Sequence, residues 1–445
     1  MVDIQKIVGC KCDTVMQAHI DLWKEIYKGV VPSFHNYKVY NGKQFVGRER
    51  KSLRMGKRIC EDWANLLMNE KVQINVDNDA LNERIYKVFE ENNFYVEANA
   101  LIEKSFAFGS GAFTEYKDND GRIHIDYITA DMIYPISWTG STITECAFVS
   151  VKVIGGVSCY YVNIHRIIGG EYVVYNRLYG KDGFAPMQMP SGVLGEWHTG
   201  SMQAKFQIIR PNTVNNMEYD SPLGISILAN AWDEIRGIDL VYDSYMNEFT
   251  VGKKRIIVPE TMAQRQLEKD GITEPVFDTN DTVFYAIPGK DDGTQMPKEI
   301  DLNIRGTEHK DALQQCLNLL SDKCGLGSDR YSYSRHEVKT ATEVVSEQSE
   351  LFRNLKKHEI LLKSALIGLV RSLVEFMDYK SDVTVKIDFD DSIIEDKGTE
   401  FTRRLQLVQS GAYAPWELRA YYLNETEDTA KKFCADLASA EYAEE

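Results

Sequence analysis

The sequence predicts an α+β protein in which long amphipathic helices accompany an antiparallel sheet. Apolar residues recur every three or four positions over several stretches, the longest running from about 340 to 377. Between about 112 and 210 this spacing gives way to short β-branched and aromatic runs. Hydrophobic residues make up 43% of the chain and charged residues 27%, which is enough apolar material for a folded core.

The N-terminal part is predicted to be helical, with helices over 15–28, 46–70 and 79–107. The second of these carries a basic run that could contact phosphate or an acidic neighbour. A solvated helix face is the favoured interpretation of such a run. Its six basic residues are Arg48, Arg50, Lys51, Arg54, Lys57 and Arg58.

The sheet region contains several short strands separated by turn residues. Asn119-Asp120-Gly121 and Gly155-Gly156 are typical of tight turns between antiparallel strands. The predicted strands are 122–127, 146–154, 159–165 and 171–179.

A long helix is predicted to follow, with Ser221 as its N-cap and Pro222 in its first turn. Its apolar stripe runs from Ile225 to Phe249 at helical spacing, so the opposite face should be polar. That polar face carries Asp233, Glu234, Arg236, Asp239 and Asp243.

A small mixed subdomain is predicted between this helix and the next one, because residues 253–305 contain four prolines and lack helical spacing. Strand-like runs occur at Arg255–Val258 and Thr282–Ile287. The second helix is predicted from about 307 to 324.

The remainder of the chain begins with a polar and aromatic loop, 328–341, before the long helix 340–377. A strand over 383–389 and two helices, about 398–410 and 415–440, complete the predicted elements. Gly411 and Pro415 mark the turn between those last two helices.

No catalytic constellation is found, so we expect a protein that is not an enzyme and needs no metal or cofactor. Gly109-Ser110-Gly111 lacks the remaining residues of a dinucleotide or phosphate loop. Asp118-Asn119-Asp120-Gly121 is similar to a calcium loop, but Tyr116 and Tyr127 stand where ligands are required, which favours a hairpin turn. His336-Glu337 and His358-Glu359 do not complete a zinc-protease motif. Asp388, Asp390 and Asp391 could bind a metal together, but a strand-end turn facing solvent is the favoured interpretation.

The 8 cysteines are scattered and form no C-x-x-C pair, which favours reduced thiols and assembly in a cytoplasm. The first residues predict no signal peptide. The most apolar window, Ile360–Phe376, is interrupted by Lys363 and Arg371, so a buried helix is expected and not a membrane span.

A formal net charge of -16 argues against a protein that grips nucleic acid over its whole surface. It is compatible with a wall past which DNA slides, although acidity that serves solubility alone is the favoured interpretation. One loop differs, because basic and aromatic residues alternate there in a way that suits sequence-independent contact with phosphates. An ordinary exposed connector is the alternative for these residues, Arg330, Tyr331, Tyr333, Arg335, His336 and Lys339.

Four long segments resemble phage portal proteins of the SPP1/A118-like group, and together they span most of the chain in the expected order. They are RKSLRMGKRICEDWANLLMNEKV (50–72), YDSPLGISILANAWDEIRGIDLVYDSYMNEF (219–249), KTATEVVSEQSELFRNLKKHE (339–359) and GTEFTRRLQLVQSGAYAPWELRAYYL (398–423). Relatives often have a glycine-rich stretch before the third segment. Here it reads Ser334-Arg335-His336-Glu337-Val338, which predicts a stiffer and more basic loop.

The resemblance implies the portal fold, with parts named wing, stem, clip and crown. It implies that the basic and aromatic loop described above is a tunnel loop that faces DNA. The implied parts are a wing over 1–220, stem helix 1 over 221–252, the clip over 253–304, stem helix 2 over 305–326, the tunnel loop over 327–341, a long wing helix with its return strand over 342–394, and the crown over 395–445.

The resemblance also implies a function, which is a dodecameric ring at one capsid vertex through which double-stranded DNA is packaged and ejected. The implied partners are the large terminase, the head–tail adaptor, the scaffold and the major capsid protein, with no membrane and with assembly in the host cytoplasm. Lys253, Lys254 and Arg255 could dock terminase or adaptor, or could equally cap the end of the preceding helix. The alternatives are another minor head or adaptor protein, and a DNA-processing enzyme of a mobile element.

Overall fold

The structure is a computed structural model, in which two compact units are distinguished. The first comprises Met1–Glu70 with Ile74–Ile387, and the second Lys71–Gln73 with Asp388–Glu445. The residues that the structure describes are 14–40, 42–118, 120–180, 185–189, 193–251, 255–259, 264–266, 273–275, 284–287, 298–300, 303–332, 341–379, 383–389, 397–423, 427 and 429–434.

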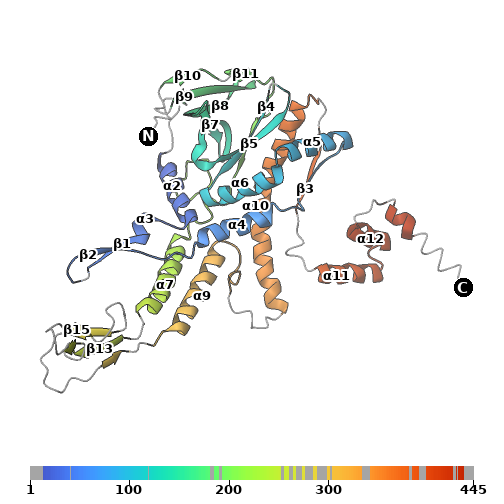
Figure 1. Cartoon of the computed structure of the whole chain (residues 1–445). Coiled ribbons are helices and arrows are strands. Elements are labelled where there is room, and N and C mark those ends of the chain that lie inside the picture. The colour runs from blue at the N-terminus through green and yellow to red at the C-terminus, as the bar shows by residue number, and fades with distance from the viewer. Residues whose placement is uncertain are drawn as a thin grey trace. The chain divides into compact units, whose positions relative to one another are not determined.

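The first unit is built from helices on an antiparallel sheet, which confirms the α+β class (Figure 1). Its N-terminal helices pack around large apolar side chains that are almost fully buried, among them Trp23, Trp63 and Phe94. The periodic spacing of these residues explains the helices, since each helix presents one apolar face to the same core. The helices are α2 Thr14–Lys28, α3 Pro32–His35, α4 Met55–Leu67, α5 Asp79–Glu91 and α6 Phe94–Phe108.

The predicted helix over 46–70 is wrong in its first part. Residues 36–49 form a hairpin instead, with β1 (Asn36–Tyr40) and β2 (Phe45–Glu49) paired antiparallel. The helix α4 begins only at Met55, after Arg54 in the left-handed conformation. The basic run that suggested a helix face is therefore divided between a strand, a turn and a helix.

The predicted helix over 79–107 is two helices, α5 and α6. The chain reverses at Asn92 and Asn93, where Asn93 adopts a φ of 49°. The Asn92 side chain accepts the amide of Ile125 at 3.0 Å and donates to the carbonyl of Ile123 at 2.9 Å. Asparagine tolerates the left-handed conformation that Asn93 adopts. The contacts of Asn92 with a strand distant in sequence fix the position of the break between the two helices.

The predicted strand region forms two antiparallel sheets. One has the order β12-β4-β5, from Gly111–Lys117 (β4), Ile123–Thr129 (β5) and Phe206–Ile209 (β12). The other has the order β10-β9-β8-β7-β6, with β11 also paired to β9. Its strands are β6 Ile133–Thr139, β7 Thr142–Ile154, β8 Val157–Ile168, β9 Glu171–Gly180, β10 Pro186–Met187 and β11 Glu196–His198, and the turn η1 Ala130–Met132 precedes β6.

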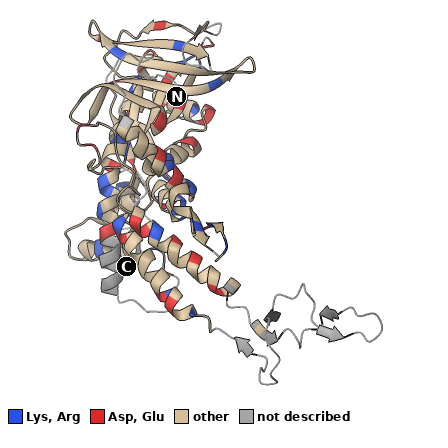
Figure 2. Cartoon of the chain, turned by 90° about the vertical axis from the view of Figure 1, so that its left-hand side faces the viewer, with Lys and Arg blue, Asp and Glu red and all other residues tan. Residues whose placement is uncertain are grey.

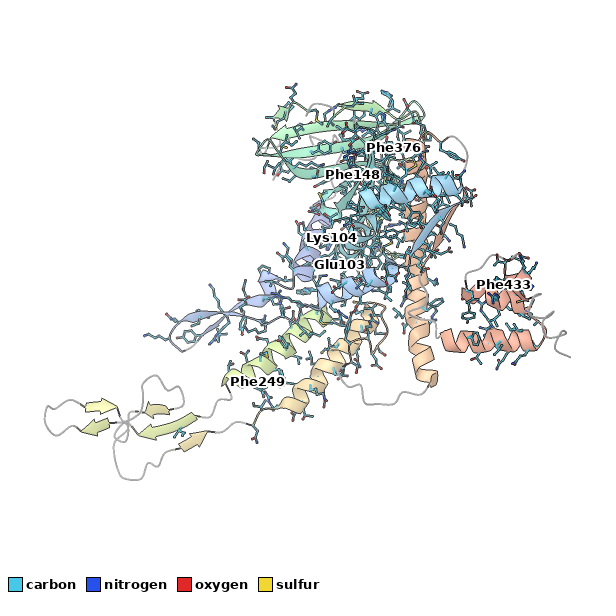
Figure 3. The ribbon with its side chains drawn as sticks, turned by 45° about the vertical axis from the view of Figure 1, so that its right-hand side comes forward. Glu103, Lys104, Phe148, Phe249, Phe376 and Phe433 are labelled. Carbon is cyan, nitrogen blue, oxygen red and sulfur yellow. The ribbon has the colours of Figure 1, made fainter. Side chains whose placement is uncertain are left out.

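The predicted glycine turn between 146–154 and 159–165 is confirmed. Gly155 and Gly156 join β7 to β8 with φ values of 58° and 81°, which suit a two-residue hairpin loop. Inward-facing residues of β7 and β8 form a small apolar cluster of Ala147, Val149, Val162 and Ile164. Figure 3 shows Phe148 and Phe376 in the crowded region where the sheets meet the long helix α10.

The helix predicted from Pro222 begins ten residues later, as α7 (Trp232–Val251). Two backbone amides in the intervening stretch form tertiary hydrogen bonds instead of helical ones. Gly224 donates to Ser110 Oγ at 3.0 Å, and Ile227 donates to the carbonyl of Phe106 at 2.9 Å. Ser221 is not a helix cap, because no helix starts there.

Short strands separate α7 from the next helix, α9 (Gly306–Lys323). β13 pairs with β16 in parallel and with β17 antiparallel, and β14 pairs with β15. Both predicted strand runs are confirmed, and the bounds are β13 Arg255–Pro259, β14 Gln264–Gln266, β15 Thr273–Pro275, β16 Phe284–Ile287 and β17 Lys298–Ile300.

The long helix α10 (Ala341–Phe376) matches its prediction within one residue at each end. Its inward face is fully buried at Leu366, Leu369 and Leu373, beside strands β4 and β12. The strand β18 (Val385–Asp388) pairs with β3 (Gln73–Val76). In the second unit, α11 (Lys397–Gln409) confirms the predicted helix over 398–410. α12 (Pro415–Leu423) confirms the first part of the helix predicted over 415–440, and residues 427 and 429–434 are also helical.

Candidate channel site

Helices α7 and α9 lie side by side and hold the inserted strands between their ends (Figure 1). Glu248 near the end of α7 accepts the backbone amide of Arg305 at 2.8 Å and the Arg305 Nε at 2.7 Å. His309 Nε2 lies 3.1 Å from the same carboxylate. The Arg305 amide, with His309 and the guanidinium, lowers the pKa of Glu248 to about 2. The two ends of the insertion are therefore fixed close together.

The other end of the helix pair is closed by a second ion pair. Lys323 Nζ donates to Glu234 Oε1 at 2.6 Å. Acidic residues outnumber basic ones along the two helices, and Figure 2 colours the acidic positions red and the basic ones blue. The acidic residues are Asp233, Glu234, Asp239, Asp243, Glu248, Glu308, Asp311 and Asp322, and the basic ones are Arg236, Lys310 and Lys323.

Two of the acidic residues on α7 do not face solvent, contrary to the prediction of a uniformly polar face. Asp239 is 1% exposed and Asp243 is 7% exposed. Asp239 accepts the amide of Leu53 at 2.7 Å and lies 3.2 Å from His35 Nε2, while Asp243 accepts the amide of Lys51 at 3.0 Å. Burial raises the pKa of Asp239. These carboxylates attach the segment around 51–53 to α7, a role that sequence spacing did not indicate.

The root of the loop predicted to face DNA is bound to α4 through one buried carboxylate. The hydroxyl of Tyr331 donates to Asp62 Oδ2 at 2.8 Å. Arg330 lies 3.5 Å and Arg58 3.3 Å from Asp62 Oδ1. Burial, with the charge of Asp62, raises the pKa of the Tyr331 hydroxyl. Asp62 was not identified as a site residue from the sequence, because nothing in its own helix distinguishes it.

A tight turn before the loop fixes the direction in which the chain leaves α9. Gly325 and Gly327 adopt φ values of 77° and 81°. Trp63 Nε1 donates to the carbonyl of Cys324 at 3.1 Å, and Asn354 donates to that of Gly325 at 3.0 Å. A Cβ on Gly325 would lie 3.1 Å from the Asn354 amide nitrogen, so glycine suits both the backbone and the space.

The other predicted site residues lie largely outside the described part of the chain. This holds for Tyr333, Arg335, His336 and Lys339 of the loop, and for Lys253 and Lys254 of the clip. Arg255 is the first residue of β13, opposite Ile300, and its side chain is not described. The DNA-facing and partner-docking assignments therefore stay predictions.

Part of the basic run near the N-terminus is engaged within the chain. The guanidinium of Arg50 lies 4.6 Å from the ring of Phe34 and 4.5 Å from that of Tyr37. Lys57 Nζ lies 2.5 Å from Glu103 Oε1, a residue labelled in Figure 3. These contacts argue against one continuous phosphate-binding face on this run.

The motifs that resemble ligand loops have structural roles. Asp118 accepts the amide of Arg122 at 2.8 Å and lies 2.9 Å from His124 Nε2, as expected for a hairpin turn. Gly109 ends α6 with a φ of 90°, where its backbone approaches Gly224 closely. Among the described residues, no group of three or more His, Cys, Asp or Glu could hold a metal ion. No helix within the described ranges has the length and apolar character needed to cross a membrane.

Comparison with known protein families matches residues 17–432 to phage portal proteins of the SPP1 Gp6-like type. Because the match covers nearly the whole chain, this protein belongs to that family. It is thus a structural, capsid-associated protein of bacteriophage type. No curated protein was found to match the chain.

Proposed function

We propose that twelve copies of this chain form a ring at one capsid vertex, and that DNA is packaged and ejected through the central channel. The observation that supports this most directly is the pair α7 and α9, which is closed by ion pairs at both ends and interrupted by a small β subdomain. A heterologous interface repeated around an axis closes into such a ring. In this proposal α7 and α9 are the stem, and 253–304 is the clip.

The loop 327–341 is the proposed contact with DNA. Arg330 and Tyr331 are engaged with Asp62 at its root, so in this proposal they position the loop. Contact with the phosphate backbone is then assigned to Tyr333, Arg335, His336 and Lys339. Cationic and aromatic side chains provide such contact without reading sequence.

The clip is the proposed docking site for the large terminase during packaging and for the head–tail adaptor afterwards. Lys253, Lys254 and Arg255 are the residues assigned to this contact, since they lie where α7 passes into the clip. The outer wing is assigned to the scaffold and the major capsid protein. Assembly is proposed in the host cytoplasm, with the mature ring in the virion.

The test of the proposed function is electron microscopy of the purified protein and of capsids. Rings with a central channel, and density for the protein at a single capsid vertex, are the expected result. A protein that stays monomeric at high concentration and is absent from capsid vertices would refute the proposal.

The family is structural, and we propose that the chain has no catalytic activity of its own. ATP hydrolysis during packaging is assigned to the terminase. Nuclease and ATPase assays of the purified protein, with and without Mg²⁺, should give no turnover. Turnover that persists through purification would instead favour a DNA-processing enzyme.

A further inference from the structure

A two-stranded hairpin, Asn36–Glu49, projects from the first unit beside α7; it is called the arm below (Figure 1). The register places Tyr40 opposite Phe45 and Val39 opposite Val46. The ring centroids of Tyr40 and Phe45 are 5.4 Å apart at the tip. The arm belongs to neither of the two larger sheets.

Both faces of the arm are open to solvent in the single chain. Phe45 is 71% exposed, Tyr40 57% and Val39 44%, although these side chains alternate between the two faces. A hairpin of two strands has little stability on its own, and clustered exposed apolar side chains usually mark a contact surface. A surface that covers the arm is therefore missing from the isolated chain.

The root of the arm is rigid. His35, just before β1, is 2% exposed and lies 3.2 Å from Asp239 of α7. After β2, Arg50 covers the rings of Phe34 and Tyr37. The arm is thus held in a fixed direction, which lowers the entropy cost of docking it on another surface.

The residues that flank the arm on either side, and α9, contact opposite faces of α7. On one face of α7, Trp232 contacts the ring of Phe34 and Asp239 lies beside His35. On the same face, Asp243 accepts the amide of Lys51. Glu234 and Glu248 meet α9. At 100° per residue, the first group lies about 140–180° around the helix from the second. In a head-to-tail ring, opposite sides of one chain are the surfaces that meet between neighbours.

The charges of these two sides are complementary. The arm carries three basic residues, Lys38, Lys43 and Arg48, and one acidic residue, Glu49, in a chain of net charge -16. α9 has an exposed stripe at helical spacing with an apolar residue, Leu319, that is 57% exposed. The other members of that stripe are Glu308, Asp311, Gln315 and Asp322.

We propose that the arm docks on the exposed stripe of α9 in a neighbouring copy of this chain, with Phe45 and Tyr40 against Leu319 and the basic residues beside the acidic ones. This inference rests on the ring of the proposed function and names one of its interfaces. A second copy is favoured over DNA as the occupant, because the tip is apolar on both faces, with the aromatic pair on one of them, and the acidic acceptor is present on the chain itself.

Photocrosslinking of the full-length purified protein tests the occupant. Phe45 is replaced by p-benzoylphenylalanine, and labelled and unlabelled chains are mixed before irradiation. We expect crosslinks between chains that map to residues 306–323 of the second copy. The same replacement at Trp138, an aromatic residue on β6 that is 44% exposed, measures random encounter. Crosslinks to added DNA only, within one chain only, or no more frequent than at Trp138 would overturn the proposal.

Charge reversal tests the energetics independently. The double variant Lys38→Glu/Arg48→Glu should raise the concentration at which rings dissociate at least tenfold, as measured by mass photometry on dilution. Adding Asp311→Lys/Asp322→Lys should restore much of that loss. The matched control is Lys87→Glu/Lys104→Glu, with the same charge change at exposed positions of α5 and α6. Circular dichroism establishes that each variant is folded.

Different results would refute the ring and the arm interface. If the wild-type protein forms no rings, the proposed function fails. If it forms rings whose dissociation is the same in the arm variant as in the control, or if reversal on α9 restores nothing, the arm interface is wrong while the ring stands.

Discussion

At the scale of single residues, Glu115 of the first unit is a buried acid whose pKa differs from its ordinary value. It is 2% exposed in strand β4, where burial raises its pKa to about 8, against the opposing effects of the Ser372 hydroxyl and of Lys205. Lys205 in turn lies 2.5 Å from Glu375. Glu115 is therefore largely protonated at neutral pH, and its proton is part of the folded state.

We predict that Glu115→Gln stabilises the protein at alkaline pH. The folded pKa lies above the unfolded one, so wild-type stability is complete below about pH 4.5 and falls as pH rises towards 8. Gln keeps the hydrogen bond with Ser372 without the charge. The thermal midpoint should match the wild type at pH 5 and exceed it at pH 9, by an amount corresponding to roughly a few kcal/mol. A difference that is constant between pH 5 and 9 would contradict this reasoning; Glu91→Gln, on an exposed helix face, is the control.

The buried carboxylate of Asp62 carries the second prediction at this scale. Asp62→Ala removes the acceptor of Tyr331 and leaves Arg58 and Arg330 without their shared counter-charge. Hydrogen bonds to a charged group contribute about 1.5–3 kcal/mol, so amide exchange around 328–332 should accelerate roughly 10- to 100-fold. Hydrogen–deuterium exchange measures this directly. Asp62→Asn keeps an acceptor for Tyr331 and should show a smaller change in exchange. Equal effects of the two variants would argue that the hydrogen bond from Tyr331 does not hold the loop.

At the scale of elements, the ion pairs between α7 and α9 decide how firmly the inserted strands are held. Glu248→Gln weakens the contact with the Arg305 side chain and with His309. We expect faster limited proteolysis at both ends of the insertion, near 252 and 303, while α10 stays protected. Glu308→Gln, an exposed acid one position before His309, should leave the cleavage rate unchanged. Faster cleavage throughout the chain would indicate general destabilisation instead.

The loop carries the second prediction at this scale. Alanine at Arg330, Arg335 and Lys339 should leave ring assembly intact but impair packaging or retention of DNA, because phosphate contacts are lost. Arg330→Ala alone should act mainly on the loop root, whereas Arg335→Ala/Lys339→Ala should reproduce the packaging defect. Packaging assays in reconstituted capsids separate these variants. Normal packaging and retention in the triple variant would remove the loop from the DNA path.

Elements with strong local signals could be predicted from the sequence. The apolar stripe of α10 and the glycine pair between β7 and β8 define their elements without help from the rest of the fold. Local spacing failed where tertiary hydrogen bonds override it. Ile225 and Leu228 have helical spacing, but neighbouring amides bond to Ser110 and Phe106.

The candidate site shows the same limit. Composition and order indicated the helix pair, the insertion and the basic loop. The residues that hold these parts together were not recognisable, because Asp62, Asp239 and Glu248 acquire their partners from segments far away in the chain. From a single sequence, a buried and hydrogen-bonded acidic residue on a helix cannot be distinguished from an exposed one.

At the scale of the whole molecule, acidity bears on how DNA would pass through a ring. Twelve copies of a chain with net charge -16 carry about -192 charges, a field that repels the DNA backbone. Binding through phosphate neutralisation weakens steeply with salt, so a surface with few clustered cations should bind duplex DNA feebly. The proposed ring should therefore let DNA slide, with contact confined to the cations of one loop per subunit.

We predict that assembled rings do not retain a linear duplex of about 150 base pairs at 150 mM salt, and show at most weak binding at 20 mM. Fluorescence anisotropy of labelled DNA titrated with rings measures both conditions. Any binding at 20 mM should be lost in Arg335→Ala/Lys339→Ala rings, which assigns it to the loop. The Lys87→Glu/Lys104→Glu rings, with altered charge on α5 and α6, should bind as the wild type does. Tight binding at 150 mM would mean that DNA is gripped over a broad surface, contrary to an acidic channel.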